Sequence, residues 1–165
     1  MGKLLFRIAR LKVLGIFVGL AFAYFPFLIP VKKVAQNKKV VAFRHPSPSY
    51  PNHILIIPRK IARTMFHLSG EDFSAVIEAA TKIRYGDTSN FVLMINGGKR
   101  QDVMQAHFHL FSENLAASKG KKSAVPLPEV TFNLRGMLEQ LNVPEEDFSL
   151  VFQFKKHANP AAYFM

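Results

Sequence analysis

The segment Gln101–Phe111, QDVMQAHFHLF, decides the fold, because polar and apolar residues alternate along it from Gln105 onward. Alternation with a period of two residues is typical of a strand that is buried on one face only. The polar face of this strand would carry an amide and two imidazoles, from Gln105, His107 and His109. The other face is apolar and is expected to pack into a core.

Two elements precede this strand. The apolar run Phe91–Ile95 predicts a second strand, and Asn96–Arg100, NGGKR, predicts a turn-rich basic loop. A strand, a glycine loop with two cations and a strand with two imidazoles form a candidate phosphate site. Imidazole attacks phosphorus near neutral pH, while loop amides and cations hold the oxygens. The alternative is that two histidines at i and i+2 are simply solvated surface.

An earlier segment adds to this pattern. Two strands, Lys39–Phe43 and His53–Ile57, are predicted on either side of Arg44–Asn52, a turn that contains three prolines. His53 stands at the start of the second strand.

Together, the two segments resemble the histidine triad (HIT) superfamily of nucleotide hydrolases and transferases. The signature of that family is His-x-His-x-His followed by apolar residues, usually after Gln-x-Val. The earlier segment is similar to the family's strand-turn-strand, with a proline-rich turn and a His before an Ile-Pro end. The resemblance covers roughly residues 38–114. It implies an α+β fold with an antiparallel sheet of about five strands and one main helix, here preceded by a transmembrane helix.

The chain departs from the family pattern at several positions. Gln105 stands in place of the first His of the triad, so the motif reads Gln-x-His-x-His. Asp102 stands where many members have a Ser or Thr that contacts the phosphate. His45 stands where nucleoside-binding members carry an Asp for the ribose hydroxyls. The Asn96 loop is also about two residues shorter than in common members.

The resemblance implies a role for each site residue. His107 would attack the α-phosphorus of a nucleoside 5′-phosphate derivative and form a nucleotidyl-histidine intermediate, and His109 would hold a non-bridging oxygen. Gln105 can donate a hydrogen bond but cannot shuttle a proton, which favours cleavage of pyrophosphate bonds. The scheme requires no metal and no cofactor. The substrate- or phosphate-binding residues would be Phe43, His53, Asn96, Lys99, Arg100 and Asp102.

Alternative functions stay open. The membrane-associated CDP-diacylglycerol pyrophosphatases resemble this chain in the Gln-x-His-x-His pattern, and their substrate is a nucleotide-linked lipid. In a non-enzymatic alternative, the changes at Gln105 and Asp102 have silenced catalysis and left a module that binds nucleotides or headgroups. Asp102 favours that alternative, since a carboxylate near a phosphate repels it unless it is paired with a cation.

The N-terminal run Val13–Val31 contains no charged residue and is 19 residues long, near the ~20 residues that cross a bilayer as a helix. A cleaved signal peptide and an internal hairpin are the alternatives, but the apolar run continues past the candidate cleavage site Ala21–Ala23. We expect a single-pass membrane anchor. Basic residues flank the run equally on both sides, so the side of the membrane stays open.

Charge is distributed unevenly, with a net charge of +11 and all 11 acidic residues between positions 71 and 147. The basic first part favours anionic headgroups and phosphorylated substrates as partners. Nucleic acid is not expected, because the basic residues are not interleaved with exposed aromatics in a nucleic-acid-reading motif. Family members often dimerise, so a homodimer is an open alternative.

The remaining elements complete the expected organisation. Ser69 is a candidate N-cap for a helix that runs to about Tyr85. A short helix, Asn133–Leu141, and a strand, Phe148–Phe154, are predicted near the C-terminus. The predicted division is a basic N-terminus and anchor over residues 1–33, a HIT-like core over 34–125, and a C-terminal extension over 126–165 that packs on the core.

Overall fold

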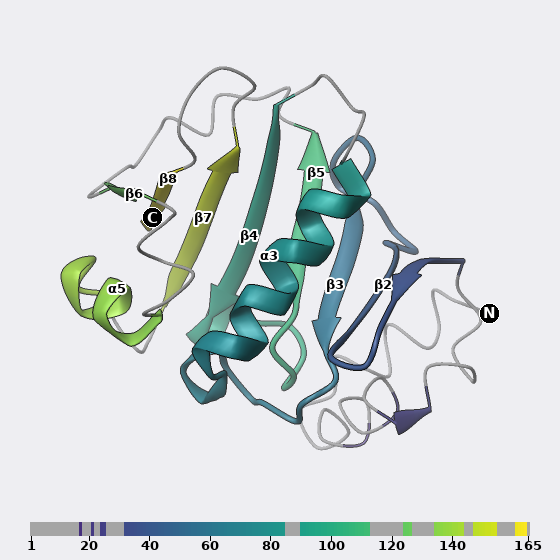
Figure 1. The fold of residues 1–165 in the computed structure, drawn as a ribbon, viewed down its shortest axis with the longest axis horizontal. Helices are drawn as coiled ribbons and strands as arrows, with labels where there is room; N and C mark the ends of the chain where they lie inside the picture. The colour runs from purple at the N-terminus through teal and green to yellow at the C-terminus, as the bar shows by residue number, and fades with distance from the viewer. Residues whose placement is uncertain are drawn as a thin grey trace.

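The computed structural model describes residues 17, 21, 24–25, 32–84, 90–112, 124–126, 134–143, 147–154 and 161–164. Over these residues the chain forms one antiparallel sheet of eight strands with the long helix α3 packed across one face (Figure 1). The order of the strands is β1-β2-β3-β5-β4-β7-β8-β6. The predicted α+β class, with an antiparallel sheet and one main helix, is confirmed.

The strands are β1 (Lys33–Gln36), β2 (Val40–Arg44), β3 (Ile54–Pro58), β4 (Phe91–Gly97), β5 (Phe108–Ser112), β6 (Ala124–Pro126), β7 (Phe148–Phe154) and β8 (Ala161–Phe164). The helices are α3 (Gly70–Arg84) and α5 (Leu134–Gln140), with single 3-10 turns at η2 (Met65–His67) and η3 (Gly98–Arg100).

The expected count of about five strands was wrong, since the described residues contain eight. The strands that the sequence did not predict are β1, β6 and β8, whereas β7 is the predicted strand Phe148–Phe154. β1 pairs with β2, and β7 pairs with β4 along its whole length, from Phe91↔Phe154 to Gly97↔Phe148. β8 and β6 continue the same sheet beyond β7.

The boundaries of two central strands also differ from the prediction. β5 begins at Phe108 rather than at Gln105, because the amide of Ala106 donates to the carbonyl of Ala62 instead of to a neighbouring strand. β4 extends to Gly97, so Asn96 lies in a strand and not in a loop. Its pairing with β7, which is remote in the sequence, supplies the hydrogen bonds for the two extra residues.

The main core lies between α3 and the sheet. Phe73 of α3 is fully buried, and its ring lies 5.1 Å from that of Phe152 and 5.8 Å from that of Phe108. Burying a side chain of this size contributes about 1.5–3 kcal/mol relative to leaving it exposed. Phe108 and Leu110 point toward α3 as the alternation predicted, so His109 and Phe111 lie on the opposite face of the sheet.

The predicted anchor, Val13–Val31, lies outside the described residues except for Phe17, Ala21, Tyr24 and Phe25. Among the residues that the structure describes, no helix combines the length and the apolar character needed to span a bilayer. The anchor and the division into three segments stay predictions.

Candidate functional site

His53 and His109 meet on the face of the sheet that α3 leaves uncovered. His53 immediately precedes β3, and the antiparallel pairing of Leu55 with His109 brings β5 alongside it. The two imidazoles are joined by a hydrogen bond of 2.9 Å between His53 Nε2 and His109 Nδ1. Residues 56 positions apart in the sequence thus form one polar unit.

The direction of this hydrogen bond follows from its neighbours. The backbone amide of Ser49 donates to His53 Nδ1 over 3.3 Å, and an amide can only donate. His53 Nδ1 therefore holds a lone pair, and the proton of the neutral ring is on Nε2. His53 then donates to His109, whose own proton is on Nε2 and faces away from His53.

His45 is the third imidazole of the group. Its ring stacks on that of His53 with centroids 4.2 Å apart and planes 6° apart, and its Nδ1 accepts from the amide of Ser47 over 3.1 Å. Its backbone amide donates to the carbonyl of His53 over 2.9 Å, which closes the turn between β2 and β3. One candidate ligand atom from each of His45, His53 and His109 lies within 4.8 Å of the others.

His107 lies beside this group, with its ring centroid 5.0 Å from that of His109. Its Nδ1 is 2.7 Å from the carbonyl oxygen of Gln105. Because a carbonyl can only accept, Nδ1 carries the proton and Nε2 holds the free lone pair. In this tautomer, Nε2 of His107 is the atom that can act as a nucleophile.

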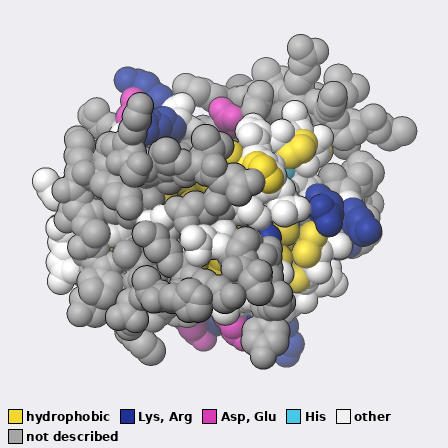
Figure 2. All heavy atoms as spheres, turned by 90° about the horizontal axis from the view of Figure 1, so that it is seen from above, with side chains coloured by type: hydrophobic (Ala, Val, Ile, Leu, Met, Phe, Trp, Pro, Cys, Tyr) yellow, Lys and Arg dark blue, Asp and Glu magenta, His cyan; other side chains and the backbone are white. Residues whose placement is uncertain are grey.

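Burial and mutual repulsion keep His53 and His109 neutral. The pKa of His53 is lowered to about 4, mainly by burial and then by the nearby His45 and His107. The pKa of His109 is lowered to about 2, again mainly by burial and then by its three histidine neighbours. Both imidazoles therefore hold a lone pair at neutral pH. On the face in Figure 2, only a small area of histidine surface (cyan) is visible, next to hydrophobic side chains (yellow).

The pKa of His107 is also lowered by burial, although the hydrogen bond to the carbonyl of Gln105 and the charge of Asp102 partly oppose the shift. Asp102 therefore lies close enough to His107 to act on it electrostatically. Asp102 itself is exposed at the rim of the site.

The structure does not bring the side chain of Gln105 to the imidazoles. Gln105 is 1% exposed, and its Oε1 accepts from the amide of Ala62 over 3.3 Å. Its Nε2 donates to the carbonyls of Lys60 over 2.9 Å and Pro58 over 3.3 Å. The amide is fully engaged with the backbone that follows β3, and these contacts do not support the predicted role of Gln105 as a donor in the site.

The side chain of Asn96 is held by Ser149, a residue that the sequence did not predict for the site. Ser149 Oγ donates to Asn96 Oδ1 over 2.7 Å, and Arg100 donates to the same hydroxyl over 3.3 Å. The amide nitrogen of Asn96 is thereby kept as the donor of its side chain. Asn96 lies two residues after Met94 in β4, and Met94 pairs with His109, so Asn96 is on the same face of the sheet as His109. Ser149 was missed because only the pairing of β4 with β7 brings it to Asn96.

Lys99 and Phe43 are two further residues that the sequence predicted for the site. Lys99 is directed to Asp147, which accepts from its backbone amide over 2.5 Å and lies 3.8 Å from its Nζ. The side chain of Lys99 is 90% exposed. Phe43 is 1% exposed and pairs with Leu55, which pairs with His109, so Phe43 lies in the sheet on the same face as His109. Of the predicted residues, the structure gathers His53, His107 and His109 into one group.

Comparison with known proteins identifies the family that has this arrangement. Residues 27–115 match the model of the HIT domain, which is more than half of the chain. The chain belongs to the HIT-domain family. It is 36% identical over 90 residues to a purine nucleoside phosphoramidase of Escherichia coli (strain K12), a match that covers 50% of this chain and 76% of that protein.

Other HIT proteins show the same relationship. An uncharacterised HIT-like protein of Chlamydia trachomatis is 28% identical over 93 residues, covering 52% of this chain and 84% of that protein. The crystal structure of a HIT family hydrolase from Legionella pneumophila aligns with a TM-score of 0.53 and 25% identity, covering 61% of this chain and 95% of that one.

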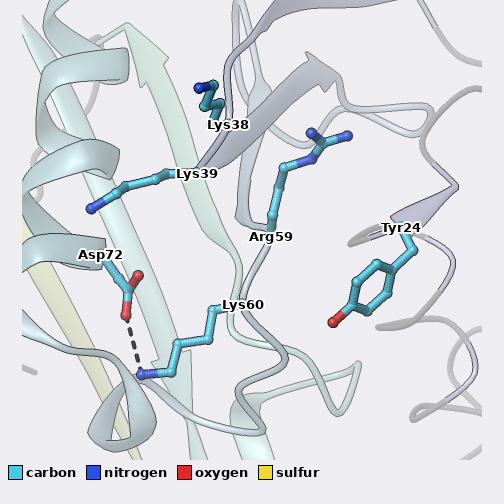
Figure 3. A pocket seen from close by; sticks show the side chains of 6 residues that line it. All are labelled: Tyr24, Lys38, Lys39, Arg59, Lys60 and Asp72. Carbon is cyan, nitrogen blue, oxygen red and sulfur yellow. Dashed lines mark ion pairs between the residues drawn. The ribbon is translucent and has the colours of Figure 1, made fainter.

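The HIT domain also carries a basic pocket at the far end of the β2–β3 hairpin from His45 and His53. The pocket has a volume of about 330 Å³ (Figure 3). Lys60 pairs with Asp72 over 3.2 Å, and Arg59 has a buried Nε that finds no acceptor among the described residues. The six lining residues are Tyr24, Lys38, Lys39, Arg59, Lys60 and Asp72.

Proposed function

We propose that this HIT protein is a nucleotide phosphohydrolase or nucleotidyltransferase that acts through a nucleotidyl-His107 intermediate. One observation carries the proposal. The 2.7 Å hydrogen bond from His107 Nδ1 to the carbonyl of Gln105 leaves the lone pair of Nε2 free. Burial lowers the pKa of the ring, so this lone pair stays unprotonated at neutral pH.

In the first step, His107 Nε2 attacks the α-phosphorus of the nucleotide derivative. A P–N bond forms, the bond from phosphorus to the leaving group breaks, and the leaving group takes the bonding electron pair. Water, or another acceptor hydroxyl, then attacks the same phosphorus and releases His107 with the lone pair on Nε2 restored.

The neighbouring donors would stabilise the charge that develops on the phosphoryl oxygens. His109 presents its Nε2 proton away from His53, and His53 fixes that tautomer through the 2.9 Å hydrogen bond. The amide nitrogen of Asn96 is oriented by Ser149. Preorganised donors of this kind contribute most where they need no rearrangement during the reaction.

The contacts of Gln105 favour a leaving group that needs no protonation. Its amide is committed to the backbone of Pro58–Ala62 and has no acidic proton to give. A phosphate or diphosphate leaves without acid help more readily than an amine does. We therefore propose phosphoanhydrides, rather than phosphoramidates, as the preferred substrates.

The basic pocket favours a second candidate, a pyrophosphatase of a nucleotide-linked lipid such as CDP-diacylglycerol. Four cations and one carboxylate line this pocket, and Tyr24 of the predicted anchor segment is among its residues. Such a surface attracts anionic headgroups. The replacement of the family's ribose-binding Asp by His45 fits a substrate that is held less by its ribose.

The deciding experiment follows nucleotide release by the full chain in mild detergent. The substrates are adenosine 5′-phosphoramidate, a diadenosine polyphosphate and CDP-diacylglycerol. His107→Ala is expected to lower release by roughly 10³-fold or more, the scale seen when a covalent nucleophile is removed. Acid quenching should trap wild-type protein that is heavier by one nucleotidyl group.

His67→Ala is the matched control, because His67 is exposed and contacts Thr64 outside the histidine group. The favoured substrate separates the soluble-nucleotide candidate from the lipid candidate. If no substrate is cleaved while wild type and His107→Ala bind nucleotide equally, the enzyme is ruled out and the silenced binding module takes its place.

A further inference from the structure

We propose that the basic pocket beside the first turn of α3 is a second binding site, which holds the phosphate group of a ligand apart from the histidines. The volume of the pocket, about 330 Å³, lies at the lower end of the ~300–1,000 Å³ that is typical of small-molecule sites, so a compact ligand fits it. Asp72 lines the pocket from α3, and α3 packs on the face of the sheet opposite the histidines (Figure 3). None of the six lining residues belongs to the histidine group.

The charges around the pocket match those of a phosphate monoester. Four cations and one carboxylate line it, and Lys39 also pairs with Glu71, outside the lining, over 2.5 Å. Four positive charges against two negative ones leave an excess of two positive charges. A phosphate monoester carries about −1.5 to −2 charges at pH 7, so one bound group would neutralise the pocket.

Lys38 and Arg59 are the cations that remain available to a ligand. Neither forms an ion pair with a carboxylate among the described residues, whereas Lys60 pairs with Asp72 over 3.2 Å. Arg59 Nη1 donates to the carbonyl of Asn37 over 3.5 Å, and its buried Nε finds no acceptor in the described part of the chain. A buried donor without a partner destabilises the folded protein. The planar guanidinium suits phosphate oxygens, and a small rotation of the side chain would direct Nε to them.

The backbone that carries these cations is fixed before any ligand binds. The side chain of Asn37 accepts from the amides of Lys39 and Val40, both over 2.8 Å, which closes the turn between β1 and β2. The amide of Arg59 donates to the carbonyl of Lys39 over 2.7 Å, which joins that turn to the end of β3. A preorganised site loses less conformational entropy when it binds its ligand.

Two sources supply a phosphate group of this kind, a lipid headgroup and a soluble phosphate ester. Ile61 follows Lys60 in the chain and Phe25 follows Tyr24, and both of these apolar side chains are exposed. Exposed apolar residues next to cations are typical of surfaces that lie on anionic membranes. The chemistry common to both sources is a phosphate group bound by lysine and arginine, and the test separates the sources.

The test follows binding by phosphorus NMR, with the full chain in a nonionic detergent. The probes are inorganic phosphate and phosphatidic acid in mixed micelles. We expect at least one probe to bind saturably, with a Kd below about 1 mM. Lys38→Gln and Arg59→Gln should each weaken this binding by about 10-fold, as expected when a hydrogen bond to a charged group is lost. Lys82→Gln is the matched control, because Lys82 is an exposed lysine of α3 outside the pocket, and it should bind like the wild type.

Asp72→Asn gives a test of opposite sign. This change removes the negative charge from the pocket and releases Lys60 from its ion pair, so the affinity for phosphate should rise several-fold. Asn also caps helices well, so the start of α3 should be kept. A variant that binds phosphate no better than the wild type would contradict a ligand beside Lys60.

The probes identify the source of the phosphate group. Binding of inorganic phosphate that Lys38→Gln weakens assigns a soluble phosphate compound, and binding of phosphatidic acid alone assigns a lipid headgroup. The proposal is overturned if neither probe saturates up to about 10 mM, a concentration that marks very weak binding. It is also overturned if Lys38→Gln and Arg59→Gln both bind like the wild type, or if Lys82→Gln weakens binding equally. The thermal unfolding midpoint of each variant without ligand shows whether it is folded.

The pocket and the proposed function can fail separately. His107→Ala should bind the probe like the wild type, because His107 does not line the pocket. Loss of binding in that variant would assign the phosphate to the histidines and overturn the proposal. Phosphate binding in the pocket without cleavage of any nucleotide would support the pocket and contradict the proposed enzyme. Cleavage without binding in the pocket would do the reverse.

Discussion

At the scale of single residues, Gln105 illustrates how a polar side chain in a strand-like pattern can serve the core. The alternation of the sequence puts it on the same face as His107 and His109, but its amide holds the backbone of Pro58–Ala62. The chain joins the sheet only at Phe108, where β5 begins, because the backbone amide of Ala106 donates to the carbonyl of Ala62 instead. No local pattern contains this contact, since the two residues are remote in the sequence.

Gln105→Ala is therefore expected to act on stability. It removes three hydrogen bonds and leaves a buried amide and two carbonyls without partners, which should lower the free energy of unfolding by about 1–3 kcal/mol. Urea unfolding of the full chain measures the difference. Gln36→Ala on the exposed strand β1 is the control, with an expected change within about 0.5 kcal/mol. A variant of unchanged stability that has lost nucleotide release would instead assign Gln105 to the chemistry.

At the scale of elements, the start of α3 was predictable because its signals are local. Ser69 caps the helix as the sequence indicated, with its Oγ accepting from the amide of Asp72 over 3.1 Å. Asp72 in turn accepts from the amide and the hydroxyl of Ser69 over 3.0 and 2.7 Å. This reciprocal pair is a capping box with Asp at the third position.

The cap predicts a pH dependence of stability. Burial raises the pKa of Asp72, but the hydrogen bonds from Ser69 and Lys60 outweigh it, so the pKa is lowered overall. The stabilisation is therefore present above the unfolded pKa of about 3.9 and is lost as the pH falls through the folded value. Ser69→Ala should cost about 0.5–2 kcal/mol at pH 7, with a smaller cost below about pH 3.

Unfolding of both proteins at the two pH values checks this expectation. Glu78→Gln is the control, because its pair with Lys82 at i and i+4 is exposed to solvent and lies away from the cap. A cost of Ser69→Ala that does not change with pH would show that the hydroxyl acts without the Asp72 carboxylate.

At the scale of the whole molecule, the C-terminal third joins the sheet at β4. The strand Phe148–Phe154 was predicted with its observed bounds, because a composition rich in aromatic and apolar residues is a local signal. Its partner was not predictable, since pairing is decided by contacts between distant segments. The same limit hid the link from Ser149 to Asn96, although Asn96 itself was predicted.

Gly97 of β4 is packed closely against β7. A Cβ at this position would overlap the ring of Phe148, which is fully buried opposite it in the sheet. Gly97→Ala should therefore destabilise the fold by about 1–3 kcal/mol, the usual cost of overpacking. The cost should shrink in a Phe148→Leu background, as urea unfolding of the double-mutant cycle would measure. An equal cost in both backgrounds would contradict a direct contact.

The place of β7 in the sheet also bears on self-association. A strand with one unpaired edge can pair with the same strand of a second copy of the chain. This is one way in which a homodimer would form. In this chain β4 has β5 on one side and β7 on the other, so its backbone is paired within the molecule along both edges. Two copies can join through β4 only if each first gives up its own β5 or β7, so β7 protects the edge of β4 that β5 does not cover.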